Sequence, residues 1–172
     1  MPLLPSVAPF AGLLTDLAGE LRRGSCCLLT ADKAWTYLLY HDLRERLRGM
    51  DVQCECVDGR PSPGVTQADD VGVMLTAVTQ LRRIVRGYTP GLVVALPHLD
   101  VMTSAAGGWT NISREMVPLL HEEPTAVLLG FRDPTLPLLP VVEKLFPKRF
   151  AVDISFHSNE GPSHLEGNSN SP

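Results

Sequence analysis

The stretch LVVALPHLD, from Leu92 to Asp100, begins as a continuous hydrophobic run and ends on proline, histidine, leucine and aspartate. A short run that is apolar at every position is typical of a strand buried on both faces, as in a parallel sheet. Residues that directly follow such a strand lie at the edge of the sheet where α/β proteins bind ligands. The stretch therefore predicts a parallel sheet and directs attention to Pro97, His98 and Asp100.

The rest of the chain alternates between strand-like and helix-like segments, which is typical of a doubly wound α/β domain. Strands are expected over residues 25–30, 51–57, 91–96, 125–130 and 149–156, and helices over 10–24, 31–49, 67–86, 112–123 and 139–146. Asp32 is expected to cap the second helix, and Pro118 to disturb the fourth. The prediction is an α/β three-layer sandwich with a five-stranded, mostly parallel sheet.

The third predicted helix is amphipathic, with a series of apolar residues at helical spacing. The face expected to pack on the sheet consists of Val71, Met74, Leu75, Val78, Leu81 and Val85.

Composition and charge favour a single soluble domain. The chain has 172 residues, of which 44% are hydrophobic and 20% charged, and its net charge is -4. This charge leaves no basic surplus for a phosphate backbone, so nucleic acid is not expected as a partner. No apolar run approaches the roughly 20 residues that cross a bilayer, so we expect no membrane span and a cytoplasmic location. Residues 1–157 are expected to form the domain, and the polar residues 158–172 a disordered tail or linker.

The four cysteines form two close pairs, Cys26 with Cys27 and Cys54 with Cys56. Neither spacing is that of a zinc knuckle, and both pairs lie in strand-like runs, where a thiol usually serves as a small buried hydrophobe. We therefore expect core cysteines and no metal site.

Three segments together resemble the large subdomain of the AAA+ ATPases. CCLLTADKAWTYLLYHDLRERL is similar to the first strand and its helix, VVALPHLDVM to the third strand, and VLLGFRDPTLPLLPVVEKLFPKRFAVDI to the last two strands with their connecting helix. The resemblance covers roughly residues 25–154. It implies the strand order 5-1-4-3-2, which would separate the two cysteine pairs. The helical lid that follows the fifth strand in that family has no counterpart in these residues, so we expect either a fragment that ends in a linker or a protein that has dispensed with the lid.

The positions that handle nucleotide in that family are altered here. A phosphate loop needs glycines, a lysine and a hydroxyl, but LTADKAWTY has no glycine, and Trp35 stands where the lysine is expected. Lys33 and Thr36 remain as remnants of that loop. The two acids of the third strand fall on Pro97 and His98, and only the later Asp100 is kept. Without a cradle, a metal ligand and a base, we expect no ATP hydrolysis, no cofactor and no catalytic residue.

Five residues are candidates for an interaction surface. They are Pro97, His98, Trp109, Arg132 and Arg149. Arg132 is interpreted as contacting Asp133 across a tight turn. Arg149 precedes Phe150 as the inter-subunit arginine of the AAA+ family does, and the other interpretation is a solvated charge.

The predicted function is that of a catalytically inactive AAA+-like domain that acts as a structural or protein-interaction module. It would be the N-terminal part of a larger ATPase or a ring partner, and it would bind a protein partner or itself, including an active AAA+ ATPase domain. One alternative is a nucleotide sensor without hydrolysis, with Gly107 and Gly108 as its cradle. Another is an unrelated α/β enzyme with Cys26 or Cys27 as nucleophile and His98 with Asp100 as base and orienting group.

Overall fold

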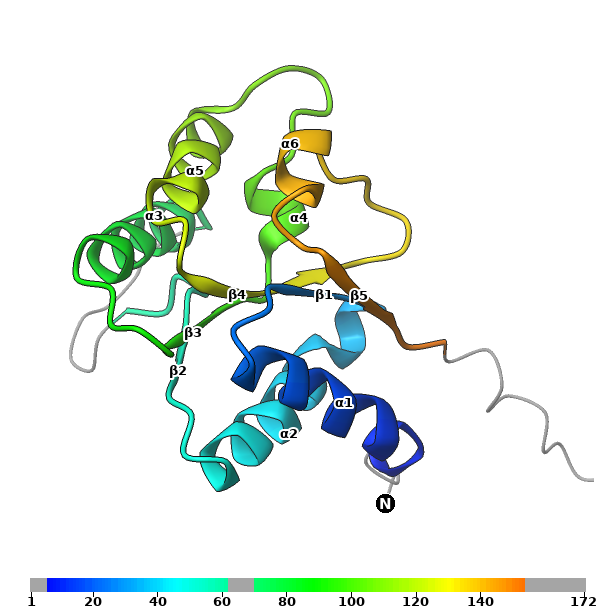
Figure 1. The fold of residues 1–172 in the computed structure, drawn as a ribbon. Helices are drawn as coiled ribbons and strands as arrows, with labels where there is room; N and C mark the ends of the chain where they lie inside the picture. Colours follow the sequence, from blue (N-terminus) through cyan, green and yellow to red (C-terminus); the bar gives the residue numbers. More distant parts are fainter. Residues whose placement is uncertain (1–5, 62–69, 154–172) are drawn as a thin grey trace, which may run out of the picture.

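A five-stranded parallel sheet forms the centre of the computed structural model, which describes residues 6–61 and 70–153 (Figure 1). The strands are β1 (Cys27–Thr30), β2 (Cys54–Cys56), β3 (Val93–Leu96), β4 (Val127–Arg132) and β5 (Lys148–Ala151). Their order is β2-β3-β4-β1-β5, and every neighbouring pair is parallel. The predicted α/β class and the strand order 5-1-4-3-2, which is the same order from the other edge, are confirmed.

Helices cover both faces of this sheet (Figure 1). One layer contains α1 (Ala11–Arg22) and α2 (Thr36–Gly49), each preceded by a short 3-10 helix, η1 (Ala8–Phe10) and η2 (Lys33–Trp35). The other layer contains α3 (Asp70–Arg86), α4 (Leu99–Met102), α5 (Asn111–Glu122) and α6 (Pro140–Glu143). The domain is therefore the predicted three-layer sandwich.

Alternate side chains of the strands feed two separate cores. Cys27, Leu29 and Ala95 pack with α1 and α2, whereas Leu28 and Val94 pack with the layer of α3 and α5. Successive side chains of a strand point to opposite faces, so a strand buried on both faces must be apolar throughout. This accounts for the continuous hydrophobic run of β3.

The buried face of α3 differs from the predicted one at Leu75, which is 56% exposed. The residues that pack on the sheet are Ala77, Val78, Leu81, Ile84 and Val85. The buried stripe is therefore centred closer to Ala77 than predicted. Residues 67–69 of the predicted helix and the side chain of Val71 lie outside the described part of the chain.

Pro118 does not interrupt α5, which continues from Asn111 to Glu122. The predicted disturbance is wrong in that respect. Thr110 and Ser113 form a reciprocal capping box, in which the Thr110 hydroxyl accepts from the Ser113 N–H at 3.0 Å and the Ser113 hydroxyl accepts from the Thr110 N–H at 3.0 Å. This cap satisfies two backbone donors at the start of the helix.

Both cysteine pairs are separated by the strand order, since β3 and β4 lie between β1 and β2. Within residues 6–61 and 70–153, no three histidine, cysteine or acidic side chains gather closely enough to hold a metal ion. In the same ranges, no helix is both long and apolar enough to cross a membrane. The predicted boundary at residue 157 and the predicted tail over 158–172 lie outside the described residues.

Candidate functional site

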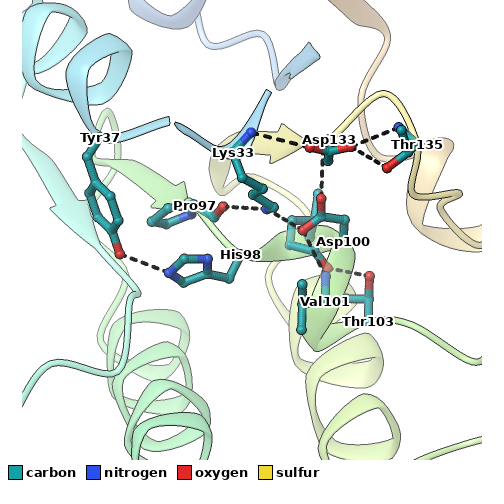
Figure 2. A network of polar contacts seen from close by, with 10 residues as sticks. Lys33, Tyr37, Pro97, His98, Asp100, Val101, Thr103, Asp133 and Thr135 are labelled. Carbon is teal, nitrogen blue, oxygen red and sulfur yellow. Dashed lines mark hydrogen bonds and ion pairs between the residues drawn. The ribbon is translucent and has the colours of Figure 1, made fainter. Parts of the chain in front are cut away.

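Three charged residues from separate loops meet at the carboxyl edge of the sheet (Figure 2). Lys33 follows β1, Asp100 follows β3, and Asp133 follows β4. The Lys33 ammonium lies 2.5 Å from Asp100 Oδ1 and donates to the Pro97 carbonyl at 3.1 Å. The structure therefore brings together the predicted residues Lys33, Pro97 and Asp100, and it ties them to one another.

Local backbone geometry directs Lys33 into this site. The predicted N-cap is confirmed, because Asp32 Oδ1 accepts a hydrogen bond from the Ala34 N–H at 2.8 Å and starts the short η2 helix. The Lys33 N–H donates to Asp133 Oδ2 at 3.3 Å. The loop after β1 is thus fixed by side-chain oxygens, where a phosphate loop would present free N–H groups.

Asp100 is the centre of the network, and its side chain is fully buried. Besides the Lys33 ammonium, the carboxylate accepts from the Val101 N–H at 2.8 Å and from the Asp133 N–H at 2.7 Å. Burying a carboxylate is costly unless it is paired and hydrogen-bonded, and both conditions are met here. Asp100 therefore connects the segments that follow β1 and β4 to the start of α4.

Asp133 extends the network to the loop after β4 (Figure 2). Hydrogen bonds from the Thr135 hydroxyl and N–H, at 2.5 and 2.9 Å, lower the pKa of the Asp133 carboxyl, and Lys33 lowers it further. The predicted contact between Arg132 and Asp133 is wrong. Arg132 is the last residue of β4, and its guanidinium binds Glu143 of α6 at 3.1 Å.

His98 lies beside the network and belongs to a second cluster. Its Nε2 is 2.9 Å from the Tyr37 hydroxyl, and the Arg60 guanidinium lies over the Tyr37 ring, 5.5 Å from its centroid. Arg60 also forms an ion pair with Asp58, which is buried. Burial lowers the pKa of His98, and the Lys33 charge adds to this effect.

Pro97 does not contribute a surface, because it is buried. The prediction that Pro97 belongs to an interaction surface is therefore corrected. Pro97 contributes its backbone carbonyl, which accepts a hydrogen bond from Lys33. Thr36 is also buried, at 2% exposure, in the first turn of α2. Trp35 meets Phe10 edge to face, with ring centroids 5.9 Å apart, so it packs with the α1 and α2 core.

The remaining candidates lie away from the network. Trp109 is 48% exposed in the loop before α5 and follows Gly107 and Gly108, which adopt φ values of 79° and 113°. Arg149 is exposed on β5, an edge strand, and so lies within the strand instead of before it.

The structure does not bring Cys27 and His98 together. Cys27 opens β1 whereas His98 follows the end of β3, and parallel strands place these positions at opposite ends of the sheet. Burial raises the pKa of the Cys27 thiol to about 12, which disfavours the reactive thiolate.

Tyr37, Asp58 and Arg60 were not among the predicted site residues. Asp58 and Arg60 follow β2 and therefore lie in a segment where the fold predicts ligand contacts. Tyr37 carries no such signal, because its contact with His98 spans 61 positions of the sequence.

Comparisons with known proteins do not assign a function to the chain. No model of a known protein family matches the sequence, and no curated protein matches it. Among solved structures, a chain of the Escherichia coli MS115-1 HORMA:CdnC:Trip13 complex is similar, with a TM-score of 0.45 and 12% sequence identity. The match covers 86% of this chain but only 63% of that one. The strand order and the contacts at the sheet edge therefore remain the evidence for function.

Proposed function

We propose that the chain is a catalytically inactive AAA+-like domain that acts as a structural or protein-interaction module. The strand order of the sheet is the one that the resemblance to AAA+ ATPases implies. The observation that carries the proposal is the contact between the Lys33 ammonium and the buried Asp100 carboxylate. It occupies the one basic group that follows β1 before α2 begins.

Binding of a nucleotide phosphate by Lys33 would require this contact to break. Separating a buried ion pair costs about 3–5 kcal/mol, because the remaining charge loses its partner. At 1.4 kcal/mol per factor of ten, this penalty weakens binding by roughly a hundredfold or more. The phosphate would also approach the Asp100 carboxylate, which repels it.

The groups after β3 give no support to phosphoryl transfer either. The Pro97 carbonyl is bound by Lys33, and His98 Nε2 is bound by the Tyr37 hydroxyl. Neither position offers a carboxylate to hold magnesium or to activate water. A domain that lacks the carboxylates for magnesium and water activation, but keeps a packed sheet, can still bind other proteins through its surface.

Calorimetric titration with ATP and magnesium, together with a phosphate-release assay, tests this proposal. We expect neither saturable heat in the micromolar range nor turnover. Replacing the strand-end pair with acids, Pro97→Asp with His98→Glu, should also give no hydrolysis, since the Lys33 contact remains. Micromolar binding with turnover would contradict the proposal, and binding without turnover would make the chain a nucleotide sensor.

The proposed partner is another protein or a second copy of the chain. Trp109 and Arg149 are the exposed candidates for such contacts, and tryptophan and arginine are common anchors of protein interfaces. If the chain self-associates, Trp109→Ala and Arg149→Ala should shift the sedimentation equilibrium toward the monomer. An assembly that neither substitution changes would exclude both residues from the interface.

A further inference from the structure

A small cavity lies beside His98, between α3 and α4. Its volume is about 240 Å³. Val73, Met74 and Ala77 of α3 and Val101 and Met102 of α4 supply its apolar wall. Asp58 and His98 complete the lining.

The two polar residues of the lining bring little charge into the cavity. The Asp58 carboxylate is paired with Arg60 and accepts from the Arg60 N–H at 3.0 Å. The His98 ring is held by the Tyr37 hydroxyl, and burial lowers its pKa, which favours the neutral imidazole. An uncharged, apolar group therefore fits the cavity best.

The size of the cavity favours a side chain over a free small molecule. Pockets for small ligands usually measure about 300–1,000 Å³, and this one is smaller. One leucine, methionine or phenylalanine side chain is an occupant of suitable scale. Two methionines in the wall can adjust to the shape of such a side chain.

A cation stands next to the cavity. The Arg60 side chain is 68% exposed, and its Nε is directed at Asp58. A guanidinium has five N–H donors, so the outer ones face solvent and can bind a carboxylate side by side. The Tyr37 ring beneath it limits the positions it can take.

The surface around the cavity has the composition of an interface. Tyr37 is 44% exposed and Val101 is 43% exposed, and both adjoin the cluster that holds His98 and Arg60. Tyrosine and arginine beside an apolar pocket are characteristic of protein-binding hot spots.

We propose that this cavity and Arg60 form a docking site for an extended segment of a partner protein, which inserts one apolar side chain and places an aspartate or glutamate on Arg60. The charge complementarity of Arg60 and the scale of the cavity select this occupant. The site rests on the proposed function as an interaction module and names the chemistry of its partner.

Selection from a display library of short random peptides, with the full chain as bait, tests the site. We expect the enriched peptides to carry leucine, methionine or phenylalanine close to an acidic residue. Binding of a labelled selected peptide, followed by fluorescence anisotropy, should weaken by roughly tenfold or more in Ala77→Met and in Arg60→Glu, since each removes a contact worth about 1.4 kcal/mol or more. Arg48→Glu is the matched control, because the Arg48 guanidinium is exposed and lies outside the cavity lining, and this variant should bind the peptide as the wild type does.

One further variant and one altered peptide separate lost binding from lost folding. Ala77 is buried, and a larger side chain there can destabilise the core, so Val101→Glu closes the same cavity from an exposed position. A peptide with lysine in place of its acidic residue should recover binding to Arg60→Glu. Three results would overturn the site: no enrichment, enrichment of peptides without the apolar and acidic pair, or peptide binding that Ala77→Met, Val101→Glu and Arg60→Glu all leave unchanged.

The ATP titration keeps the two proposals apart. Turnover together with peptide binding at the cavity would refute the inactive domain and leave the docking site standing. If there is neither turnover nor peptide binding, the docking site is refuted and the inactive domain stands. Self-association that Ala77→Met and Val101→Glu abolish would assign the cavity to a second copy and overturn the partner proposed here.

Discussion

The ion pair between Lys33 and Asp100 should be a major stabilising contact of the sheet edge. Lys33→Met keeps the length of the side chain and removes its charge, which leaves the Asp100 carboxylate buried with only the Val101 and Asp133 N–H groups as donors. Removing one member of a buried pair costs about 3–5 kcal/mol. Because two donors remain, we expect the lower end, about 3 kcal/mol.

Urea unfolding measures this loss. With a denaturant slope of about 2 kcal/mol/M, a loss of about 3 kcal/mol lowers the midpoint by about 1.5 M. The chain contains two tryptophans, Trp35 and Trp109, so fluorescence and circular dichroism can be followed together to check that the transition is two-state. The matched control is Lys148→Met, because the Lys148 contact with Glu20 is longer, at 3.8 Å, and lies at the surface. Its midpoint should stay within error of the wild type.

The double variant Lys33→Met with Asp100→Asn tests whether the loss comes from the unpaired charge of the buried Asp100 carboxylate. The amide carries no charge, and its oxygen still accepts from one of the two N–H groups, whereas its NH2 group faces the other. The cost is then that of unsatisfied donors, about 1–3 kcal/mol, and no longer that of a buried charge. The double variant should therefore be more stable than Lys33→Met alone. A Lys33→Met loss below about 1 kcal/mol, or a double variant no more stable than the single one, would refute the reasoning.

Four other outcomes are expected from local contacts. Thr110→Ala should lower the free energy of unfolding by about 1 kcal/mol, measured in urea, because α5 loses its cap. Gly59→Ala should lower it by about 1–3 kcal/mol in the same assay, since its φ is +75° and the added Cβ would lie 2.1 Å from the Val73 carbonyl oxygen. Burial lowers the pKa of His98 below its ordinary 6.5, so the unfolded state binds more protons as pH falls from 7 to 5 and stability decreases. In urea titrations across that range, His98→Gln should show a smaller decrease. The Cys27 thiol, whose pKa burial raises to about 12, should react with a disulfide reagent at pH 8 only when the chain unfolds, and a fast reaction of the native protein would contradict its burial.

The sheet could be predicted from the sequence because its signals are local. The strands β1, β3 and β4 each contain a short apolar run between helical repeats, and β3 is apolar from Val93 to Leu96. The order of the strands came from the resemblance of their ends to AAA+ ATPases, and the structure confirms it. Errors arose where the local signal was ambiguous. Leu75 fits the helical repeat as well as Ala77 does, and only packing against the sheet decides between them.

Most of the candidate site could not be predicted, because its contacts are distant in sequence. Lys33 and Asp100 are 67 positions apart, and Tyr37 and His98 are 61 apart. The short helix α4, with four residues, has no periodicity to reveal it, yet it turns Asp100 toward Lys33. The sequence predicts which residues follow the strands, but the pairing of their side chains depends on the loops.

The stretch Leu92–Asp100 and the helix that follows it connect the two proposals. Asp100, at the start of α4, is held by Lys33 and by the Asp133 N–H, whereas Val101 and Met102 of the same helix line the cavity. A four-residue helix cannot hold its own geometry, because helix formation needs more turns than it has. Besides its proposed effect on phosphate binding, the ion pair therefore contributes to the position of α4 and of the cavity wall that α4 supplies. In this arrangement, residues at the carboxyl edge of the sheet support the docking site that we propose for a partner.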